Sequence, residues 1–412
     1  MSNQLWNKQY AKFSAYGFLK NLRFFDAFFI LFLLEKNLSY TEIGILYASR
    51  EIIINIFEVP SGFIADTYGR KNSLIGSFLF YILSFIIFYA SSNFWVFLAA
   101  FLAYGIADAF RTGTHKGMIM DYLKINNWQD QKINYYGHTR AWSQKGSAIS
   151  SLVAGAIVFY SGSYQSIFLY AIIPYLLNLL LMLSYPNKLN LSKQAKNKKD
   201  VRLKLSVFFS LLKQPKVLKI MNASALHTAY LKAVKDYIQP LMVSVAMLIP
   251  LLSSVEVEQK NGLIIGVIYF MIYLATSRAS QLASKVASNR KERISYQTLV
   301  WGFLFGISCG VFYFYEIWIV ALFAFIGIYL IENMRKPILT GFIADNVPNE
   351  LLVSVISAQS LISTVITAII ALVFGILADG YGIDISFMVV SSALLVFTFL
   401  VNHFTANSKI RE

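Results

Sequence analysis

Charged side chains interrupt some of the longest apolar segments of this chain. Arg23 and Asp26 lie three residues apart in one segment, and Asp108 and Arg111 have the same spacing in another. A charge at the centre of a bilayer costs at least ~2.5–3.5 kcal/mol on insertion scales, so such residues usually face a partner or a water-filled cavity. These positions are therefore the first candidates for holding a charged solute or exchanging protons.

The pattern around Asp108 recurs in the second half of the sequence. Four residues have counterparts at one constant offset: Asp108, Arg111, Gly117 and Asp121 correspond to Glu332, Arg335, Gly341 and Asp345. Such a repeat is expected of a transporter built from two related halves. A same-helix salt bridge without functional meaning is an equal alternative for Asp108–Arg111 and Glu332–Arg335, because i,i+3 neighbours of opposite charge neutralise one another.

Among the charged residues expected to face a cavity, the cations outnumber the carboxylates: Arg23, Arg111, Lys116, Lys235, Arg335 and Lys336 against Asp26, Asp108, Asp236 and Glu332. Lysine and forked arginine donors suit a carboxylate or phosphate group, which favours an anionic or zwitterionic organic solute. The residues expected to bind it are Arg23, Arg111, His115, Lys235 and Arg335. Lys20 and Lys232 are instead expected to extend to the aqueous surface.

Three carboxylates are candidates for coupling transport to protons, namely Asp26, Asp108 and Glu332. Asp26 comes first because phenylalanines flank it on both sides, whereas Arg23 opposes the effect of that apolar environment. Histidine titrates near neutrality, so His115 is a further candidate, although a lone membrane histidine is more often only hydrogen-bonded.

The elements that position these groups are membrane-spanning helices. Of the 412 residues, 57% are hydrophobic and only 14% are charged, and the charges are concentrated in short stretches. Apolar runs of about 20 residues are typical of transmembrane helices, and the alternation of a β-barrel is missing. The sequence predicts an all-α membrane protein with about twelve such helices. They are expected at Ala15–Leu34, Tyr40–Phe57, Ser73–Ala90, Phe94–Met120, Ala141–Tyr160, Ser166–Tyr185, Val217–Pro250, Leu263–Leu282, Ile294–Tyr315, Ile317–Ile343, Leu351–Ala378 and Ile383–His403.

A long basic stretch divides the sequence near its middle. The predicted organisation is a six-helix half over residues 1–186, a cytosolic linker over 187–216, and a second six-helix half over 217–412. The halves are expected to be pseudo-symmetric around a central cavity. Lysines and arginines gather in alternate loops, which places both termini in the cytoplasm by the positive-inside rule. The net charge of +15 therefore indicates contact with anionic lipid rather than nucleic acid.

A charged motif links the second and third predicted helices. It reads Gly62-Phe-Ile-Ala-Asp66-Thr-Tyr-Gly69-Arg70-Lys71. It resembles the loop signature of the major facilitator superfamily, which reads roughly G-x-x-x-D-x-x-G-R-[RK]. The resemblance implies that the motif is cytoplasmic, that Gly62, Asp66, Gly69, Arg70 and Lys71 form a gate loop, and that helices one, four, seven and ten line the cavity.

These observations predict a secondary transporter that moves a small solute across the inner membrane by proton-coupled alternating access. The alternative is a multidrug/proton antiporter, but the fifth helix lacks the proline of the drug-exporter signature and Phe101 replaces an arginine common in the family. An enzyme is not expected, because it would need a histidine–carboxylate cluster at metal-ligand spacing, and His115 and Asp121 lie six residues apart on different helix faces. No cofactor or metal is expected, and Cys309, the only cysteine, rules out a cysteine-rich metal site. The expected partners are the solute, protons or another coupling ion, and membrane lipids, and the protein is expected to be a monomer. The solute, the direction of transport and the coupling ion stay open.

Overall fold

The computed structural model describes residues 7–190, 215–250, 255–286, 291–346 and 349–408, and within these ranges it contains helices and no β-strand. The all-α prediction is confirmed. Residues 191–214, which make up most of the expected linker, lie outside the described ranges, so the division of the chain there stays a prediction.

Eight of the described helical segments are long and apolar enough to cross a membrane. These segments are Arg70–Ala90, Phe94–Ile125, Ser166–Leu183, Val257–Ala283, Arg293–Phe314, Trp318–Leu339, Ala358–Tyr381 and Ile383–His403. Their composition identifies the chain as a multi-pass membrane protein.

The prediction of one continuous helix for the first segment is wrong, because the segment is broken. Helix α1 (Lys8–Lys20) ends at Asn21, the short 3-10 helix η2 (Phe24–Ala27) follows, and α2 (Phe29–Glu35) completes the segment. The Asn21 side chain donates to the carbonyl oxygen of Gly17 at 2.6 Å. An asparagine that bonds to the backbone in this way competes with helix continuation.

The seventh expected helix is also broken. Helix α10 (Pro215–Val234) gives way to the 3-10 turn η5 (Lys235–Tyr237), and then to α11 (Ile238–Leu248). Pro240 has no N–H for the carbonyl four residues earlier and its ring crowds that carbonyl, which explains why regular helix fails at Asp236.

The fourth expected helix divides into α5 (Phe94–Arg111) and α6 (Thr114–Ile125). Gly113 lies between them with φ +77°. Residues with a Cβ rarely adopt this left-handed conformation, so glycine permits the break. The break places Arg111 at the end of one helix and His115 in the first turn of the next.

The remaining helices follow the expected order with altered ends. They are α3 (Tyr40–Tyr68), α4 (Arg70–Ala90), α7 (Lys132–Ser161), α8 (Ser166–Leu183), α12 (Val257–Val286), α13 (Lys291–Phe314), α14 (Trp318–Asn346), α15 (Asn349–Tyr381) and α16 (Ile383–Ser408), with single 3-10 turns η3 (Gln129–Gln131) and η4 (Asn187–Leu189). Helix α3 continues past its expected end at Phe57, and α7 begins well before Ala141. Apolar runs mark only the part of a helix that lipid surrounds, which is why the polar extensions were not predicted.

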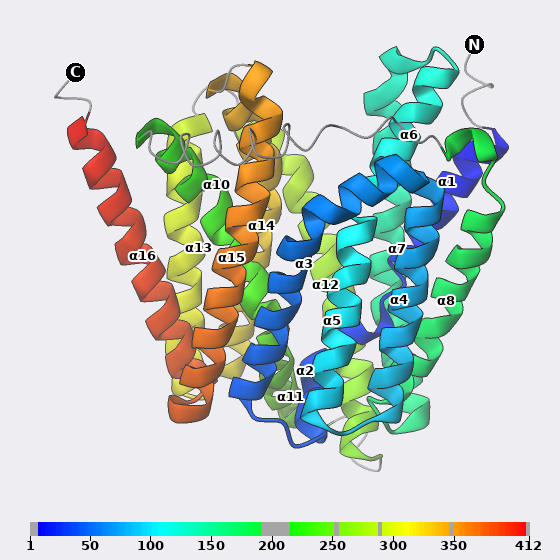
Figure 1. Cartoon of the computed structure of the whole chain (residues 1–412). Coiled ribbons are helices and arrows are strands. Elements are labelled where there is room, and N and C mark those ends of the chain that lie inside the picture. Colours follow the sequence, from blue (N-terminus) through cyan, green and yellow to red (C-terminus); the bar gives the residue numbers. More distant parts are fainter. Residues whose placement is uncertain (1–6, 191–214, 251–254, 287–290, 347–348, 409–412) are drawn as a thin grey trace. The chain divides into compact units, whose positions relative to one another are not determined.

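The chain forms two compact units. Unit 1 comprises the described parts of Met1–Asn37, Ser49–Lys196 and Pro250–Tyr273. Within it, α4 packs against α5 and α8, and α1 packs against α7 (Figure 1). Gly17 and Gly146 bring α1 and α7 together, because a Cβ on either would collide with the other helix.

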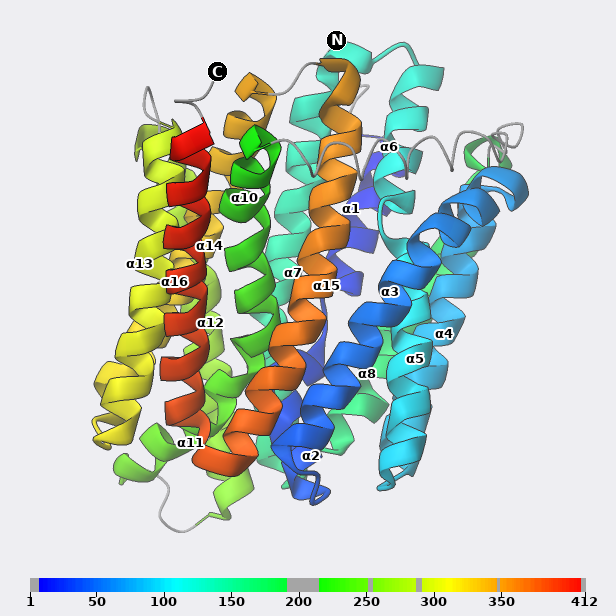
Figure 2. The same ribbon diagram turned by 60° about the vertical axis from the view of Figure 1, so that its left-hand side comes forward.

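Unit 2 comprises the described parts of Leu38–Ala48, Asn197–Ile249 and Leu274–Glu412. Within it, α10 packs against α13, α14, α15 and α16, and α13 packs against α14 and α16 (Figure 2). Tyr230 on α10 and Ser391 on α16 join these helices through a 2.7 Å hydrogen bond between their hydroxyls.

Candidate solute-binding site

A cavity of about 210 Å³ lies within unit 1. Its walls come from α1, from both sides of the α5–α6 break, and from α7. The lining residues are Phe13, Tyr16, Gly17, Lys20, Arg111, Gly113, His115, Lys116, Ile119, Tyr136, Thr139, Arg140 and Ser143.

The lining is strongly cationic. Lys20, Arg111, Lys116 and Arg140 are its basic side chains, and no carboxylate is among the described lining residues. Charge of one sign in a partly enclosed space attracts and concentrates solutes of the other sign. This cavity therefore suits an anion.

Aromatic rings support the charged groups of the cavity. Tyr16 and His115 stack with their ring centroids 3.5 Å apart and their planes 10° apart. The Lys116 Nζ lies 5.3 Å from the ring centroid of Tyr136, within the range of a cation–π contact. The Tyr185 hydroxyl forms a hydrogen bond with His115 Nε2 at 3.3 Å. The predicted residue His115 thus lies in the cavity wall on a fixed aromatic support.

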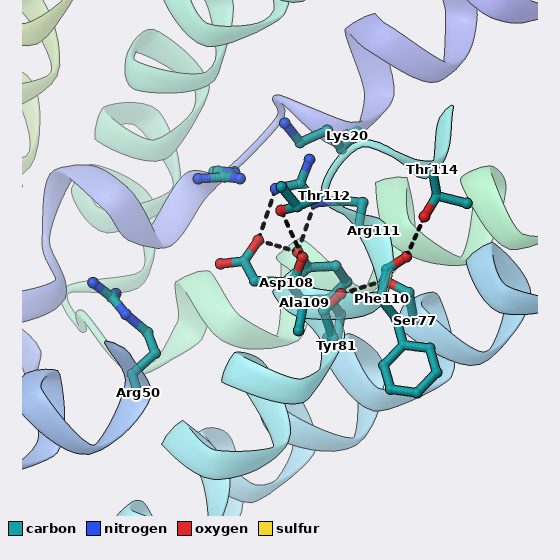
Figure 3. A network of polar contacts seen from close by, with 12 residues as sticks. Lys20, Arg50, Ser77, Tyr81, Asp108, Ala109, Phe110, Arg111, Thr112 and Thr114 are labelled. Carbon is teal, nitrogen blue, oxygen red and sulfur yellow. Dashed lines mark hydrogen bonds and ion pairs between the residues drawn. The ribbon is translucent and has the colours of Figure 1, made fainter. Parts of the chain in front are cut away.

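Asp108 and Arg111 form a salt bridge that a third residue reinforces (Figure 3). Arg111 Nη2 donates to Asp108 Oδ1 at 2.8 Å, and Arg111 Nε donates to the Tyr81 hydroxyl at 2.8 Å. That hydroxyl in turn donates to Asp108 Oδ1. Asp108 therefore fixes Arg111 in place, while Arg111 still lines the cavity. The structure confirms the salt bridge, and the functional role of the pair stays a prediction.

The broken first helix carries Arg23 and Asp26. Their side chains approach to 3.7 Å and are each about one-quarter exposed. Neither residue is among those that line the cavity. Lys20, at the end of α1, is in the cavity wall, contrary to the expectation that it extends to the surface.

A second polar cluster lies within unit 2, between α10 and α14. His227 Nδ1 lies 2.8 Å from Glu332 Oε2, and both side chains are almost fully buried. The Thr228 hydroxyl donates to Glu332 Oε1 at 2.7 Å. Gly302 on α13 lies against the other edge of the imidazole, because a Cβ there would come within 2.1 Å of His227 Nε2. The predicted residue Glu332 thus has a histidine partner from another helix.

Arg335 has a different environment from the one predicted. Its guanidinium is buried and donates to the carbonyl oxygen of Ser295 at 2.5 Å, to the Thr298 hydroxyl at 2.6 Å, and to the carbonyl oxygen of Ala223. These bonds tie α14 to α13 and α10. The geometry favours a structural role for Arg335 over contact with a solute.

Lys235 lies in the turn that interrupts the seventh segment. Its Nζ is 3.4 Å from Asp236 Oδ1, and the Tyr47 hydroxyl donates to the other oxygen of that carboxylate at 3.1 Å. Asp236 thereby links the start of α3 to this turn within unit 2.

The expected gate loop is almost entirely helical. Only Gly69 lies between α3 and α4, with φ +90°, and a Cβ on it would also collide with the Asn190 side chain. Arg70 Nη1 forms a 2.7 Å salt bridge with Asp121 Oδ2 on α6. Lys71 Nζ donates to the carbonyl oxygens of Leu183 and Tyr185 at the end of α8.

The other two motif residues make fewer contacts. Gly62 is exposed, and no atom lies near the position of an added Cβ. Asp66, in the last turn of α3, is half-buried and forms no hydrogen bond or salt bridge with the residues that the structure describes. Arg70 and Lys71 therefore tie the start of α4 to α6 and to the end of α8, and Gly69 permits the turn before it. Asp66 makes no comparable contact with a described residue.

Several residues of the two clusters were not predicted. They are Lys20, Arg140 and Tyr81, which belong to the cavity or its support. Arg140 was missed because it lies in the polar extension of α7. A signal existed for Lys20, since it lies one turn before Arg23 within an apolar segment. For metals, the described residues contain no group of His, Cys, Asp or Glu arranged to hold an ion.

Comparison with known proteins identifies the family. The model of the Major Facilitator Superfamily matches residues 21–371. YxaM of Bacillus subtilis (strain 168), described as an uncharacterized MFS-type transporter, is 23% identical over 400 residues, covering 90% of this chain and 89% of the relative.

Solved transporters share the fold. The nucleoside transporter NupG superposes with a TM-score of 0.76 at 14% identity, covering 96% of this chain and 99% of its own. A peptide transporter POT in complex with sulfate gives 0.72 at 11% identity, with coverages of 97% and 94%. A bacterial homolog of the human lysosomal transporter Spinster gives 0.73 at 12% identity, with both coverages 98%. The loop motif, the helical fold and the family match agree, and the chain belongs to the Major Facilitator Superfamily of membrane transporters.

Proposed function

We propose that this protein is a secondary active transporter that carries a small anionic or zwitterionic organic solute across the cytoplasmic membrane by proton-coupled alternating access. The observation that carries the proposal is the cavity in unit 1, with four cationic side chains and no carboxylate in its described lining. Arg111 and His115, both expected from the sequence to bind solute, are in its wall.

The architecture of the proposal is twelve membrane helices in two six-helix halves, with both termini in the cytoplasm. The helix order supports it, because the described elements follow the twelve expected segments with three of them broken. The distribution of lysine and arginine supports the orientation. Breaks in the first, fourth and seventh segments fit a family in which discontinuous helices surround a midplane site.

The alternative function is multidrug/proton antiport. The aromatic residues of the cavity would suit a lipophilic drug, but the four positive charges would repel the lipophilic cations that many drugs resemble. The charge of the lining therefore favours a solute with a carboxylate or a phosphate.

Proton coupling is assigned first to Glu332 with its partner His227. The two groups share one short contact away from bulk water, and imidazole is the side chain best suited to proton exchange near neutral pH. Asp26 is a second candidate, because it is partly exposed beside Arg23. Asp108 is a weaker one, since its protonation would disturb both the Arg111 and the Tyr81 contacts.

In the proposed cycle, the motif at the α3–α4 junction stabilises one closed state. Arg70 is already anchored to Asp121, so it holds the junction within unit 1. Asp66, without a described partner, would gain one when the pathway closes on the cytoplasmic side.

The test is transport by purified protein in liposomes under an imposed pH gradient, with a panel of organic anions, zwitterions and lipophilic cations. Uptake of an acidic or zwitterionic solute that depends on the gradient is expected. Arg140→Gln should weaken it, whereas Lys145→Gln is the matched control: it also lies on α7 and is exposed, but it lies over Trp142 outside the cavity lining. Gradient-driven movement of lipophilic cations alone would reject the proposal in favour of the antiporter.

A further inference from the structure

Building on the proposed transport function, we infer that the cavity binds an organic anion with at least two negative charges, such as a dicarboxylate or a phosphate monoester, and that Lys20 binds the second charge. The proposed function requires only an anionic or zwitterionic solute. The charges around the cavity indicate a narrower class.

The charge of Arg111 is already balanced. Asp108 lies on the same helix and outside the cavity lining, and it accepts a hydrogen bond from Arg111 Nη2 at 2.8 Å. Arg111 can still donate its remaining N–H groups to a solute, but the pair as a whole is neutral. Three cations of the lining, Lys20, Lys116 and Arg140, have no carboxylate salt bridge to a described residue.

Lys20 is the most informative of these three. It is half-buried, and its ammonium group forms no hydrogen bond or salt bridge with any residue in the described ranges. Its backbone is fixed, because α1 ends there and the Tyr175 hydroxyl donates to its carbonyl oxygen at 3.4 Å. A lysine close to the protein surface normally extends into water, whereas this one is in a cavity wall beside Arg111 (Figure 3).

The four basic side chains of the cavity differ in their exposure to solvent. Lys20 and Arg111 are half-buried, whereas Lys116 and Arg140 are exposed. The lining also includes the hydroxyl-bearing residues Tyr136, Thr139 and Ser143, which are neutral. A singly charged solute would leave most of the positive charge uncompensated in a space partly shielded from water. A solute with two negative charges can engage Lys20 and Arg111 together, or one inner and one outer cation.

Dicarboxylates and phosphate monoesters share this chemistry, and a set of matched probes distinguishes them. Succinate is compared with its monoamide, which has nearly the same size and one charge less. Glycerol 3-phosphate is compared with glycerol, and inorganic phosphate is included alone. The measurement is thermal unfolding of the purified full-length protein in detergent as a function of probe concentration, at constant ionic strength with chloride as the balancing anion.

We expect succinate, glycerol 3-phosphate or both to stabilise the protein with an apparent Kd at least ~10-fold below that of the less charged analogue, because one charge-assisted hydrogen bond contributes on that order. Lys20→Gln should weaken binding of the dianion until its apparent Kd is about that of the less charged analogue. Lys20→Arg should retain most of the difference between the two probes. Lys232→Gln is the matched control, since Lys232 precedes Lys235 by three residues, as Lys20 precedes Arg23, and lies on α10 in unit 2. It should keep the wild-type preference.

Equal stabilisation by both members of each pair would overturn the inference, as would an unchanged preference in Lys20→Gln. The comparison of probes on the wild-type protein stands even if a Lys20 variant does not fold. Liposome transport separates this inference from the proposed function. Flux of singly charged or zwitterionic solutes, with the dianions inert, would reject the dianion site and leave proton-coupled transport intact. Dianion binding without flux of any solute would support the site and reject transport.

Discussion

Replacing Glu332 with glutamine should separate solute movement from the proton gradient. Glutamine keeps the shape of the side chain and can still accept from the Thr228 hydroxyl, which is 2.7 Å from Oε1. It removes the negative charge that faces His227 Nδ1 at 2.8 Å. The variant should therefore fold and still exchange solute, but it should no longer accumulate solute in response to a pH difference.

The contact between His227 and Glu332 sets how strongly solute accumulation by the wild-type protein should depend on the pH difference. His227 and Glu332 face each other through a single contact, and we propose that the pair exchanges one proton in each transport cycle. One proton per cycle predicts that the solute ratio at equilibrium changes tenfold per pH unit, which corresponds to about 1.4 kcal/mol. Two protons would give a hundredfold change, or about 2.8 kcal/mol.

The assay is solute accumulation in proteoliposomes over a series of imposed pH differences, with the membrane potential clamped at zero by potassium and valinomycin. Counterflow, in which unlabelled solute inside drives entry of labelled solute, measures exchange without net proton movement. The wild-type protein should show a slope of one decade per pH unit. Glu332→Gln should show no slope while keeping counterflow within a few-fold of the wild type.

Two results would refute the reasoning. A slope of one decade in Glu332→Gln would mean that another group, such as Asp26, carries the proton. A slope of two decades in the wild type would mean that the His227–Glu332 pair is not the sole site. Asp26→Asn is the matched control, and it should retain the wild-type slope if the pair alone couples transport.

Three further predictions test the supporting geometry. Gly302→Ala should reduce the pH slope in the same assay, because its Cβ would come within 2.1 Å of His227 Nε2 and displace the ring, while Gly306→Ala would disturb Tyr230 and Ser391 instead and serves as the control. Tyr81→Phe should raise the KM for solute several-fold with a smaller change in the maximal rate, since it removes the hydroxyl that contacts both Arg111 and Asp108. An unchanged KM would contradict the proposal that Tyr81 holds Arg111 in position. Arg335→Met should lower the free energy of unfolding by at least about 2 kcal/mol, because the acceptors on Ser295, Thr298 and Ala223 lose a charged donor; thermal unfolding would show it, and an unchanged midpoint would exclude the structural role.

The helical architecture could be predicted because its signal is simple. Apolar runs of membrane length gave the order of the elements, and most expected segments coincide with a described helix. The helix ends could not be predicted in this way. Polar extensions such as the start of α7 at Lys132 lie outside the apolar run that marks the segment.

The breaks within helices depend on local chemistry that the apolar pattern hides. Asn21, Gly113 and Pro240 each had a readable conformational preference, but single residues of these types also occur in continuous helices. Pro337 is an example here, since it lies inside α14. Only the packing around each residue decides whether the helix continues, so the sequence did not reveal that Arg111 and His115 flank a break.

The repeat relates charged residues of α5 to those of α14, but it did not predict their partners. Asp108 and Arg111 pair with each other at 2.8 Å, as the i,i+3 spacing suggests. At the corresponding positions, Glu332 pairs with His227 on another helix, and Arg335 donates to neutral acceptors. The repeat conserves the positions of the charges, whereas the partner of each carboxylate is set by helices that differ between the halves.

This difference has a consequence for the division of labour that we propose. A carboxylate paired with arginine has a partner that holds its proton permanently, because guanidinium does not deprotonate in proteins. A carboxylate paired with histidine has a partner that can give up or accept a proton near neutral pH. Asp108 is therefore suited to fixing Arg111 in the wall of the anion cavity, and Glu332 is suited to exchanging protons.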